Sequence, residues 1–232
     1  MNTDNTRAVA ATIGDAGSYG AVRTSSANRV LRNTYYLLAM TLAFSALVAA
    51  ASASLRLPGP GLLLTLGGYF GLLFLTSYLR NSIWALPAVF ALTGFMGYTL
   101  GPLIAAYLAL PSGPGVVVTA MGTTAAIFVG LSWYASSSSA PDMSRFGSFL
   151  MIGILTAFGL GLAAYFFDMA ALALAVSGMF VLLMSGLIMY QTQAIVRGGE
   201  DNYVMATVTL FVSIYNLFAS LLQILGVLGG ED

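Results

Sequence analysis

Long stretches without a single charged residue are the feature that most constrains this chain. Residues 33–55 and 57–79 are uncharged, and residues 81–141 form a run of 61 residues that holds no Asp, Glu, Lys or Arg. An α-helix needs about 20 predominantly apolar residues to cross the hydrocarbon core of a membrane. The sequence therefore predicts membrane-spanning helices, and the longest run must hold more than one of them.

A turn rich in Pro and Gly divides that longest run. The segment LPSGPG, residues 110–115, is typical of a loop between helices, because Pro and Gly interrupt regular structure. Three more apolar segments follow the second half of the run. Seven spans are predicted in all, at residues 33–55, 57–79, 83–108, 116–135, 146–167, 169–196 and 203–228.

The overall composition supports this prediction. The chain is 59% hydrophobic and 7% charged, with a mean hydropathy of +0.90, whereas roughly a quarter of the residues in a globular domain are charged. The apolar surplus must face the lipid bilayer, and the alternating pattern of a β-barrel is absent, which leaves helices. We expect an all-α fold, a seven-helix transmembrane bundle. The net charge is zero and the basic residues are scattered, so nothing indicates nucleic-acid binding.

The arginines indicate how the bundle is oriented. With seven crossings, seven of the eight arginines fall on the side of the N-terminus, and Arg56 falls on the other. Because basic residues accumulate on the cytoplasmic side of a membrane, we expect a cytoplasmic N-terminus and a periplasmic C-terminus. Residues 1–28 are rich in small and polar residues and are expected to form a disordered cytoplasmic tail. Residues 29–232 are expected to form a single seven-span domain.

The chain carries few of the groups that catalysis or metal binding requires. It contains no Cys and no His, which removes thiol chemistry and the usual zinc sites. No ionisable residue lies well inside a predicted span, and Asp168 is expected to be a solvated residue between the fifth and sixth spans. A serine nucleophile would lack its usual base, and no pair of carboxylates is available for an aspartyl mechanism. We expect no enzymatic activity, no cofactor and no metal.

Polar residues form one narrow face on the last predicted span. They recur at intervals of three and four residues, which is the spacing of a single helical face. Such a helix is expected to lie inside the bundle. The seam can serve hydrogen bonding between helices, or it can line a small aqueous cavity, and the sequence leaves both interpretations open. The seam consists of Thr209, Ser213, Asn216, Ser220 and Gln223.

Glycines recur at packing intervals in two other spans. Gly67 and Gly71 lie four residues apart, and Gly94, Gly97 and Gly101 lie close to one stripe of the third span. Small residues at this spacing let two helix backbones approach closely in a membrane. We expect both groups to lie in helix–helix contacts.

Three segments carry a resemblance to a known family. They are residues 30–45 (VLRNTYYLLAMTLAFS), 93–102 (TGFMGYTLGP) and 198–216 (GGEDNYVMATVTLFVSIYN). Together they resemble the Bax-inhibitor family, in its bacterial YccA-like branch, from about residue 28 to the C-terminus. The resemblance implies a bundle whose last helix is central and wrapped by the other six. It also implies a place in the bacterial inner membrane.

Two activities follow from the resemblance. Some members of the family are pH-gated calcium leak channels, whose gate is a pair of carboxylates on the last two helices. In this chain those two positions hold Gln191 and Ser213, and a further acidic position of some members holds Thr209. An amide and a hydroxyl do not titrate near neutral pH, so the resemblance carries the fold across but not the proton gate.

The YccA-like branch instead associates with the membrane-anchored, ATP-dependent zinc protease of the FtsH type. The resemblance therefore implies a non-enzymatic membrane protein that modulates membrane-protein quality control by binding this protease. The cytoplasmic tail would be the segment that the protease engages. The alternative function is an ion leak channel, for calcium in particular, whose acidic pH gate has been lost.

Overall fold

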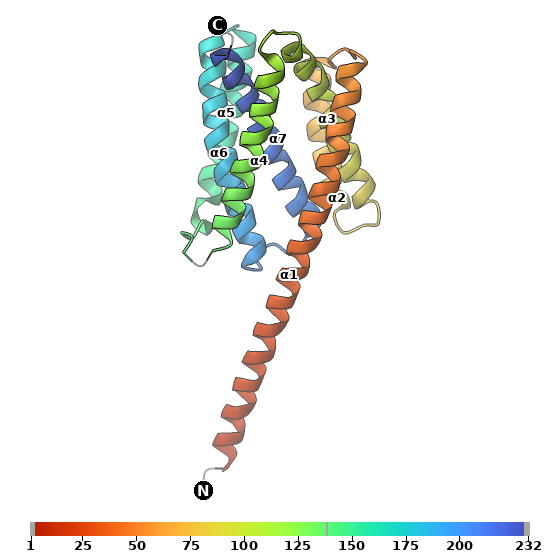
Figure 1. Ribbon diagram of the computed structural model, residues 1–232. Coiled ribbons are helices and arrows are strands. Elements are labelled where there is room, and N and C mark those ends of the chain that lie inside the picture. Colours follow the sequence, from red (N-terminus) through yellow and green to blue (C-terminus); the bar gives the residue numbers. More distant parts are fainter. Residues whose placement is uncertain (1–2, 138, 230–232) are drawn as a thin grey trace.

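The computed structural model describes residues 3–137 and 139–229, with side chains described from Asn28 onwards. Within these residues every regular element is a helix (Figure 1). Seven helices are long and apolar enough to cross a membrane, as the sequence predicts, and the part of the first helix that qualifies is Asn28–Ser54. The helices are α1 (Thr3–Ser54), α2 (Gly61–Leu79), α3 (Ala85–Leu108), α4 (Gly113–Ala135), α5 (Gly147–Phe166), α6 (Ala170–Val196) and α7 (Tyr203–Leu228), with a short 3₁₀ helix, η1 (Ser144–Phe146), before α5.

Apart from the start of α1, the observed helix ends lie within a few residues of the predicted ones. Among these other ends the largest difference is at α2, which begins at Gly61 rather than at residue 57. Pro58 and Pro60 precede that start, and the fixed φ angle and missing N–H of proline keep the segment out of a helix interior. The turn at residues 110–112 separates α3 from α4 as predicted.

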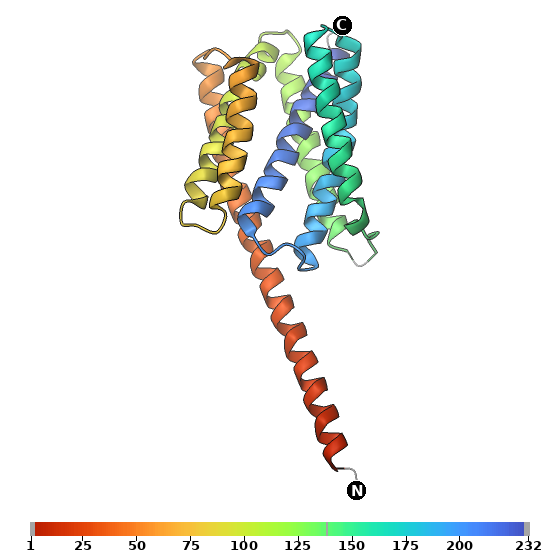
Figure 2. The ribbon, with the colours of Figure 1, turned by 180° about the vertical axis from the view of Figure 1, so that it is seen from behind.

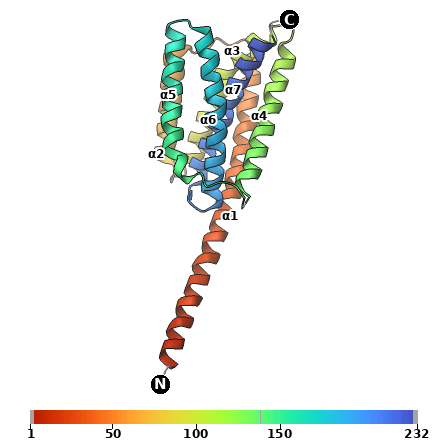
Figure 3. The same ribbon diagram turned by 90° about the vertical axis from the view of Figure 1, so that its left-hand side faces the viewer.

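The N-terminal segment differs from the irregular chain that its composition predicts. The backbone continues α1 outward to Thr3, as a single helix that projects from the bundle (Figures 1 and 3). The first proline of the chain is Pro58, so no proline interrupts this stretch. Residues 1 and 2, and the side chains of residues 3–27, lie outside the described part, as do residues 230–232. A tail that is separate from the domain at residue 28 remains a prediction.

The bundle has two sides, which we name after the chain ends. The N-side is the side from which α1 enters and carries the α2–α3, α4–α5 and α6–α7 loops, and the C-side carries the other three loops (Figure 1). Five arginines with described side chains lie at the N-side and Arg56 lies at the C-side. The N-side arginines are Arg29, Arg32, Arg80, Arg145 and Arg197.

Helix α7 lies at the centre of the bundle, which confirms the predicted architecture. It packs against α1, α3, α4 and α6, while α2 packs on the outer face of α3 and α5 packs on α6. Seen from behind, α7 runs between α1–α3 on one side and α4–α6 on the other (Figure 2). The rings of Phe70 on α2 and Phe158 on α5 meet with their centroids 5.7 Å apart, which closes the outer layer. Large side chains of α7 that are almost fully buried include Leu210, Phe211 and Leu217.

The α1–α3 contact depends on the glycine stripe of α3. A Cβ atom at Gly97 would collide with the backbone carbonyl of Ser45, and one at Gly101 would collide with the side chain of Ser52. Because a colliding backbone atom cannot move aside as a side chain can, Gly97 sets the distance between the two helices. The predicted packing role of this stripe is confirmed.

The same prediction is wrong for α2. A Cβ atom at Gly67 or Gly71 would meet no other atom within 4 Å, because both glycines lie on the exposed outer surface. The glycine of α2 that does permit a close contact is Gly68, which lies against the ring of Phe95 on α3. The spacing of glycines therefore identified a possible packing face, but not how α2 is rotated about its own axis.

These two environments give a matched test of packing. We expect Gly97→Leu to lower the free energy of unfolding by about 1–3 kcal/mol or more, because the side chain overpacks the α1–α3 contact. The control, Gly67→Leu, places the same side chain in lipid and is expected to change the free energy of unfolding by less than about 1 kcal/mol. Unfolding of the purified proteins by a denaturing detergent measures both. Equal losses from the two substitutions would contradict the assigned interface.

Candidate functional site along the last helix

The start of α7 is fixed by Asn202. The side-chain Oδ1 of Asn202 accepts hydrogen bonds from the backbone N–H groups of Val204 and Met205, both at 3.0 Å. This satisfies two of the N–H groups that a helix start otherwise leaves without partners. The Nδ2 group of Asn202 donates to Oδ1 of Asn81 at 2.9 Å and to the carbonyl of Arg80 at 3.3 Å. Asn202 thus holds α7 against the α2–α3 loop on the N-side.

A second N-side anchor is Gln193 on α6. Its Oε1 accepts from the backbone N–H of Met143 at 3.0 Å, and its Nε2 donates to the carbonyl of Pro141 at 2.8 Å. Arg197, one turn further along, pairs with Asp142 at 2.6 Å. The sequence predicts a flexible loop at residues 135–141, but these bonds tie its far end to α6. Ser138 of that loop lies outside the described residues.

The electrostatics of this anchor follow from its hydrogen bonds. The backbone N–H of Ser144 donates to Asp142 at 3.0 Å, and this bond is the main reason why the pKa of the Asp142 carboxyl lies below its usual value. The positive charge of Arg197 lowers the pKa further. Both side chains are exposed, so the ion pair positions the loop rather than contributing much stability.

The structure places the polar seam of α7 inside the bundle. Ser213 is fully buried and Ser220 is buried, while Thr209, Asn216 and Gln223 are half-buried. The hydroxyl of Ser213 donates to the Thr209 carbonyl of its own helix at 2.7 Å. Only Gln223, among these five residues, makes a side-chain bond to a neighbouring helix within the described part: its Oε1 accepts from Ser177 Oγ of α6 at 2.7 Å.

The side-chain amide of Asn216 has a different hydrogen-bond partner from the one that the sequence predicts. We expect from the sequence a hydrogen bond from Asn216 to a neighbouring helix, but its Nδ2 donates to the carbonyl of Val212 at 2.8 Å. Short polar side chains can reach the carbonyl one turn earlier in their own helix, and that acceptor is available in any packing arrangement. The amide bonds the Val212 carbonyl because that acceptor is present in the helix itself, however the neighbouring helices are placed.

Two residues outside the seam also connect α7 to the surrounding helices. The hydroxyls of Tyr215 and Thr99 on α3 lie 2.8 Å apart. Thr207 donates to the carbonyl of Thr34 on α1 at 3.3 Å and to that of Tyr203 at 2.7 Å. The sequence did not predict these two contacts, because neither Tyr215 nor Thr207 lies on the helical face that the seam residues share. Polar contacts therefore bind α7 to α1, α3 and α6.

The positions that match the family's acidic gate do not form a bonded pair. Gln191 is 5% exposed, and its Nε2 has no hydrogen-bond partner among the described residues. Ser213 donates within its own helix, and Thr209 offers it the accepting carbonyl. Thr34 and Thr192 also carry buried hydroxyls without a partner in the described part. Buried polar atoms of this kind are the usual partners of internal water.

The C-side end of the seam lines a cavity of about 610 Å³. Ser220 and Gln223 contribute to its wall together with Ser177 of α6 and Tyr107 of α3. Asp168, predicted as a solvated turn residue, is exposed, has a φ of 52° and also borders this cavity. Gln223 thus both bonds a neighbouring helix and lines the cavity, and a water-filled space along the seam stays a prediction.

The donor set of this cavity is poor for calcium. Calcium takes six to eight oxygen ligands and prefers several carboxylates. Asp168 is the one carboxylate among the residues that line the cavity. In the described part of the chain, no cluster of three or more His, Cys, Asp or Glu side chains could hold a metal ion.

Comparison with known proteins agrees with this architecture. Residues 27–230 match the family described as inhibitor of apoptosis-promoting Bax1. The chain is 54% identical to an uncharacterized protein of Pseudomonas aeruginosa over 203 residues, which cover 88% of this chain and 91% of that protein. It is 48% identical to the Modulator of FtsH protease YccA of Escherichia coli K12 over 201 residues, 87% of this chain and 91% of the relative. A relative from Escherichia coli O6:H1, also 48% identical over the same share of each chain, is named Inner membrane protein YccA.

The family match spans all seven of the apolar helices, and the relatives cover about nine-tenths of each chain. The chain is a multi-pass inner membrane protein, and it belongs to the Bax-inhibitor family as a YccA-like member.

Proposed function

We propose that this protein is a non-enzymatic modulator of membrane-protein quality control, which acts by direct contact with a membrane-anchored, ATP-dependent protease of the FtsH type. The name of the Escherichia coli relative supports the partner. The observation that carries the proposal in this chain is the projection of α1 beyond the bundle on the arginine-rich side (Figure 3).

The distribution of arginines supports a cytoplasmic N-side. Five described arginines lie at that side, against Arg56 at the other. An excess of basic residues marks the cytoplasmic end of a membrane protein. In this orientation the projecting part of α1 extends into the cytoplasm, where ATP is available to a protease that unfolds its substrates.

The chemistry of the bundle supports a role by contact rather than by catalysis. The chain has no His or Cys to act as base or nucleophile. The polar side chains at the centre are hydroxyls and amides, and several of them are occupied by bonds within α7. A bundle whose central polar groups are uncharged can still present a surface and a chain end to a partner.

The projecting helix is suited to be the first segment that a processive protease grips. A helix without tertiary contacts is marginally stable in water, because most helical stability in proteins comes from packing. Pulling on residues 3–27 therefore meets little resistance, whereas each span beyond Asn28 is held by its neighbours and by lipid. A protein that is engaged but resists extraction would occupy the protease and slow the turnover of other membrane substrates.

Deleting residues 2–20 tests this role. We expect the shortened protein to live longer than the full-length protein in membranes that contain the protease, because the free end has become too short to grip. Pulse-chase labelling measures both lifetimes. A control with residues 2–20 replaced by an unrelated polar sequence of equal length should be degraded at the normal rate if length alone matters. Equal lifetimes of the shortened and full-length proteins, both correctly inserted, would contradict the proposal.

A second candidate function is an ion leak through the bundle. The observation that favours it is the C-side cavity, into which the seam residues Ser220 and Gln223 face. A gate in this protein could not be acidic at the family's positions, because Gln191 and Ser213 do not titrate near neutral pH. Any flux along this path would therefore lack the proton control of the acidic members.

Ion flux into liposomes tests this alternative. We expect any calcium flux through the native protein to be independent of pH between about 6 and 8, because no carboxylate pair is present to bind a proton. In the double variant Gln191→Asp, Ser213→Asp, two close carboxylates raise one another's pKa, so a pH response should appear in that range. Each single variant serves as a control with one carboxylate. A steep pH dependence in the native protein would contradict this account.

A further inference from the structure

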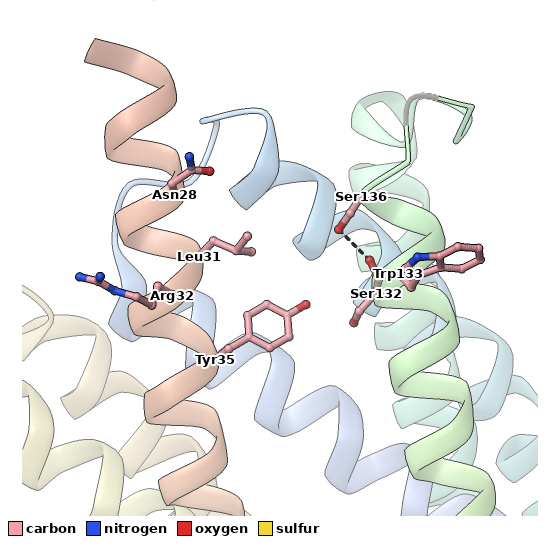
Figure 4. A pocket seen from close by; sticks show the side chains of 7 residues that line it. All are labelled: Asn28, Leu31, Arg32, Tyr35, Ser132, Trp133 and Ser136. Carbon is pink, nitrogen blue, oxygen red and sulfur yellow. Dashed lines mark hydrogen bonds between the residues drawn. The ribbon is translucent and has the colours of Figure 1, made fainter. Parts of the chain in front are cut away.

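A cleft of about 530 Å³ lies between α1 and α4 on the N-side of the bundle (Figure 4). It is separate from the α7 seam and from the C-side cavity. Its mouth is open at the end of α4, and its inner part is bordered by Leu31 and Tyr35 of α1. Its lining also includes Asn28, Arg32, Ser132, Trp133 and Ser136.

The clearest sign of a ligand is the hydroxyl of Ser132. The residue is 7% exposed, and its Oγ has no hydrogen-bond partner among the described residues. Figure 4 shows this side chain directed towards α1, from which Tyr35 extends towards it. A serine in a helix can normally bond the carbonyl one turn earlier, so a buried hydroxyl that leaves this bond unmade is available to a partner in the cleft.

The cleft lies at the level of the lipid headgroups. The membrane-spanning part of α1 begins at Asn28 and α4 ends at Ala135, so the mouth of the cleft coincides with the edge of the spans. Trp133, at the outer rim, is 79% exposed, as expected for an aromatic residue at a membrane interface. Leu31 and the ring of Tyr35 give the cleft an apolar floor, and the Tyr35 ring in turn packs against Phe128, with the ring centroids 6.0 Å apart.

Arg32 is the charged residue that lines the cleft. In Figure 4 its guanidinium points away from the cleft, on the side of α1 opposite Tyr35 and α4. No carboxylate lies within ion-pair distance of Arg32 in the described part of the chain, where Arg197 and Asp142 form the ion pair. Because the side chain of Arg32 is long and exposed, it can turn towards the mouth without moving the backbone.

The end of α4 opposes the binding of an anion at this mouth. The C-terminal end of α4 carries a partial negative charge and lies at the same mouth. Three of its last four carbonyls accept hydrogen bonds: that of Ser132 from Ser136 Oγ at 2.8 Å, that of Trp133 from the Ser136 N–H at 3.2 Å, and that of Tyr134 from the Ser137 N–H at 2.9 Å. These bonds reduce the partial negative charge that an anion held by Arg32 would meet.

We propose that this cleft binds an anionic phospholipid, with the phosphodiester at the mouth and the start of an acyl chain against the apolar floor. Arg32 would meet the phosphate, and the Ser132 hydroxyl would donate to one of its ester or phosphate oxygens. Basic pockets between membrane helices are known binding sites for anionic headgroups. The proposal requires only the membrane-spanning fold and does not depend on the proposed protease partner.

The two tryptophans of the chain provide the test. Trp133 lies at the cleft, and Trp84 lies on the same side of the bundle, 62% exposed, at the start of α3. The variant Trp84→Phe therefore reports on the cleft alone, and Trp133→Phe reports on a control site at the same side. Each protein is reconstituted in vesicles of phosphatidylethanolamine that contain a small fraction of phosphatidylglycerol brominated near the carbonyl end of its acyl chains, which quenches nearby tryptophan.

We expect the quenching of Trp133 to correspond to a local fraction of brominated phosphatidylglycerol about fivefold above its fraction in the whole membrane. This is the enrichment that one arginine near an anionic lipid produces. Quenching of Trp84, measured in a variant that also carries Arg80→Gln to remove the arginine of the same loop, should follow the bulk fraction. Arg32→Gln and Ser132→Ala, each in the Trp84→Phe background, should reduce the enrichment at Trp133, whereas Arg145→Gln should not. Brominated phosphatidylethanolamine should show no enrichment at either site. Quenching of Trp133 that follows the bulk fraction of phosphatidylglycerol, or enrichment that Arg32→Gln leaves unchanged, would overturn the proposal.

Discussion

The constraint on which the rest of this structure depends is that hydrocarbon offers no hydrogen-bond partners. Polar side chains in a membrane span must find partners within the protein. Helix α7 carries several polar side chains that lipid could not satisfy. It is enclosed by α1, α3, α4 and α6, which keep these side chains away from lipid. The helices with the most apolar outer surfaces, such as α2, can remain at the edge, where Leu63 and Phe74 face lipid. The central position of α7 thus follows from its own side chains.

Enclosing α7 requires the surrounding helices to approach closely and their loops to be held in place. The approach of α1 to α3 depends on Gly97 and Gly101. On the N-side, Asn202 joins the α6–α7 loop to the α2–α3 loop, and Gln193 joins α6 to the α4–α5 loop. The result is a bundle with uncharged groups along its axis and arginines at one end. The proposed function accordingly uses the surface of the bundle and its projecting end.

The features that the sequence predicted well are those that depend on local composition. The seven spans could be predicted because charged residues and prolines mark their ends, and the central place of α7 because its polar residues share one helical face. The resemblance of three segments to the Bax-inhibitor family agreed with both.

The features that the sequence predicted poorly depend on how neighbouring helices are rotated. Gly67 and Gly71 have the spacing of a packing face but lie on the outside, because the rotation of α2 is set by Gly68 against Phe95. Asn216 bonds its own helix, and of the five seam residues Gln223 bonds a neighbouring helix, while Tyr215 and Thr207, outside the seam, make further interhelical bonds.

The C-side cavity and the α1–α4 cleft each combine residues that are far apart in the chain. No single segment contains the pattern that would have predicted them. The unpartnered hydroxyl of Ser132 is likewise a property of its surroundings, since the sequence around it reads as an ordinary apolar helix.

The proposed function requires the arginine-rich N-side, with the projecting part of α1, to face the cytoplasm. The most direct measurement is the activity of reporter enzymes fused after Asp232, one active only in the periplasm and one active only in the cytoplasm. Seven spans and a cytoplasmic N-side predict that the periplasmic reporter is active and the cytoplasmic reporter silent. An active cytoplasmic reporter with a silent periplasmic one would contradict the orientation, and with it the proposed access of the protease to α1.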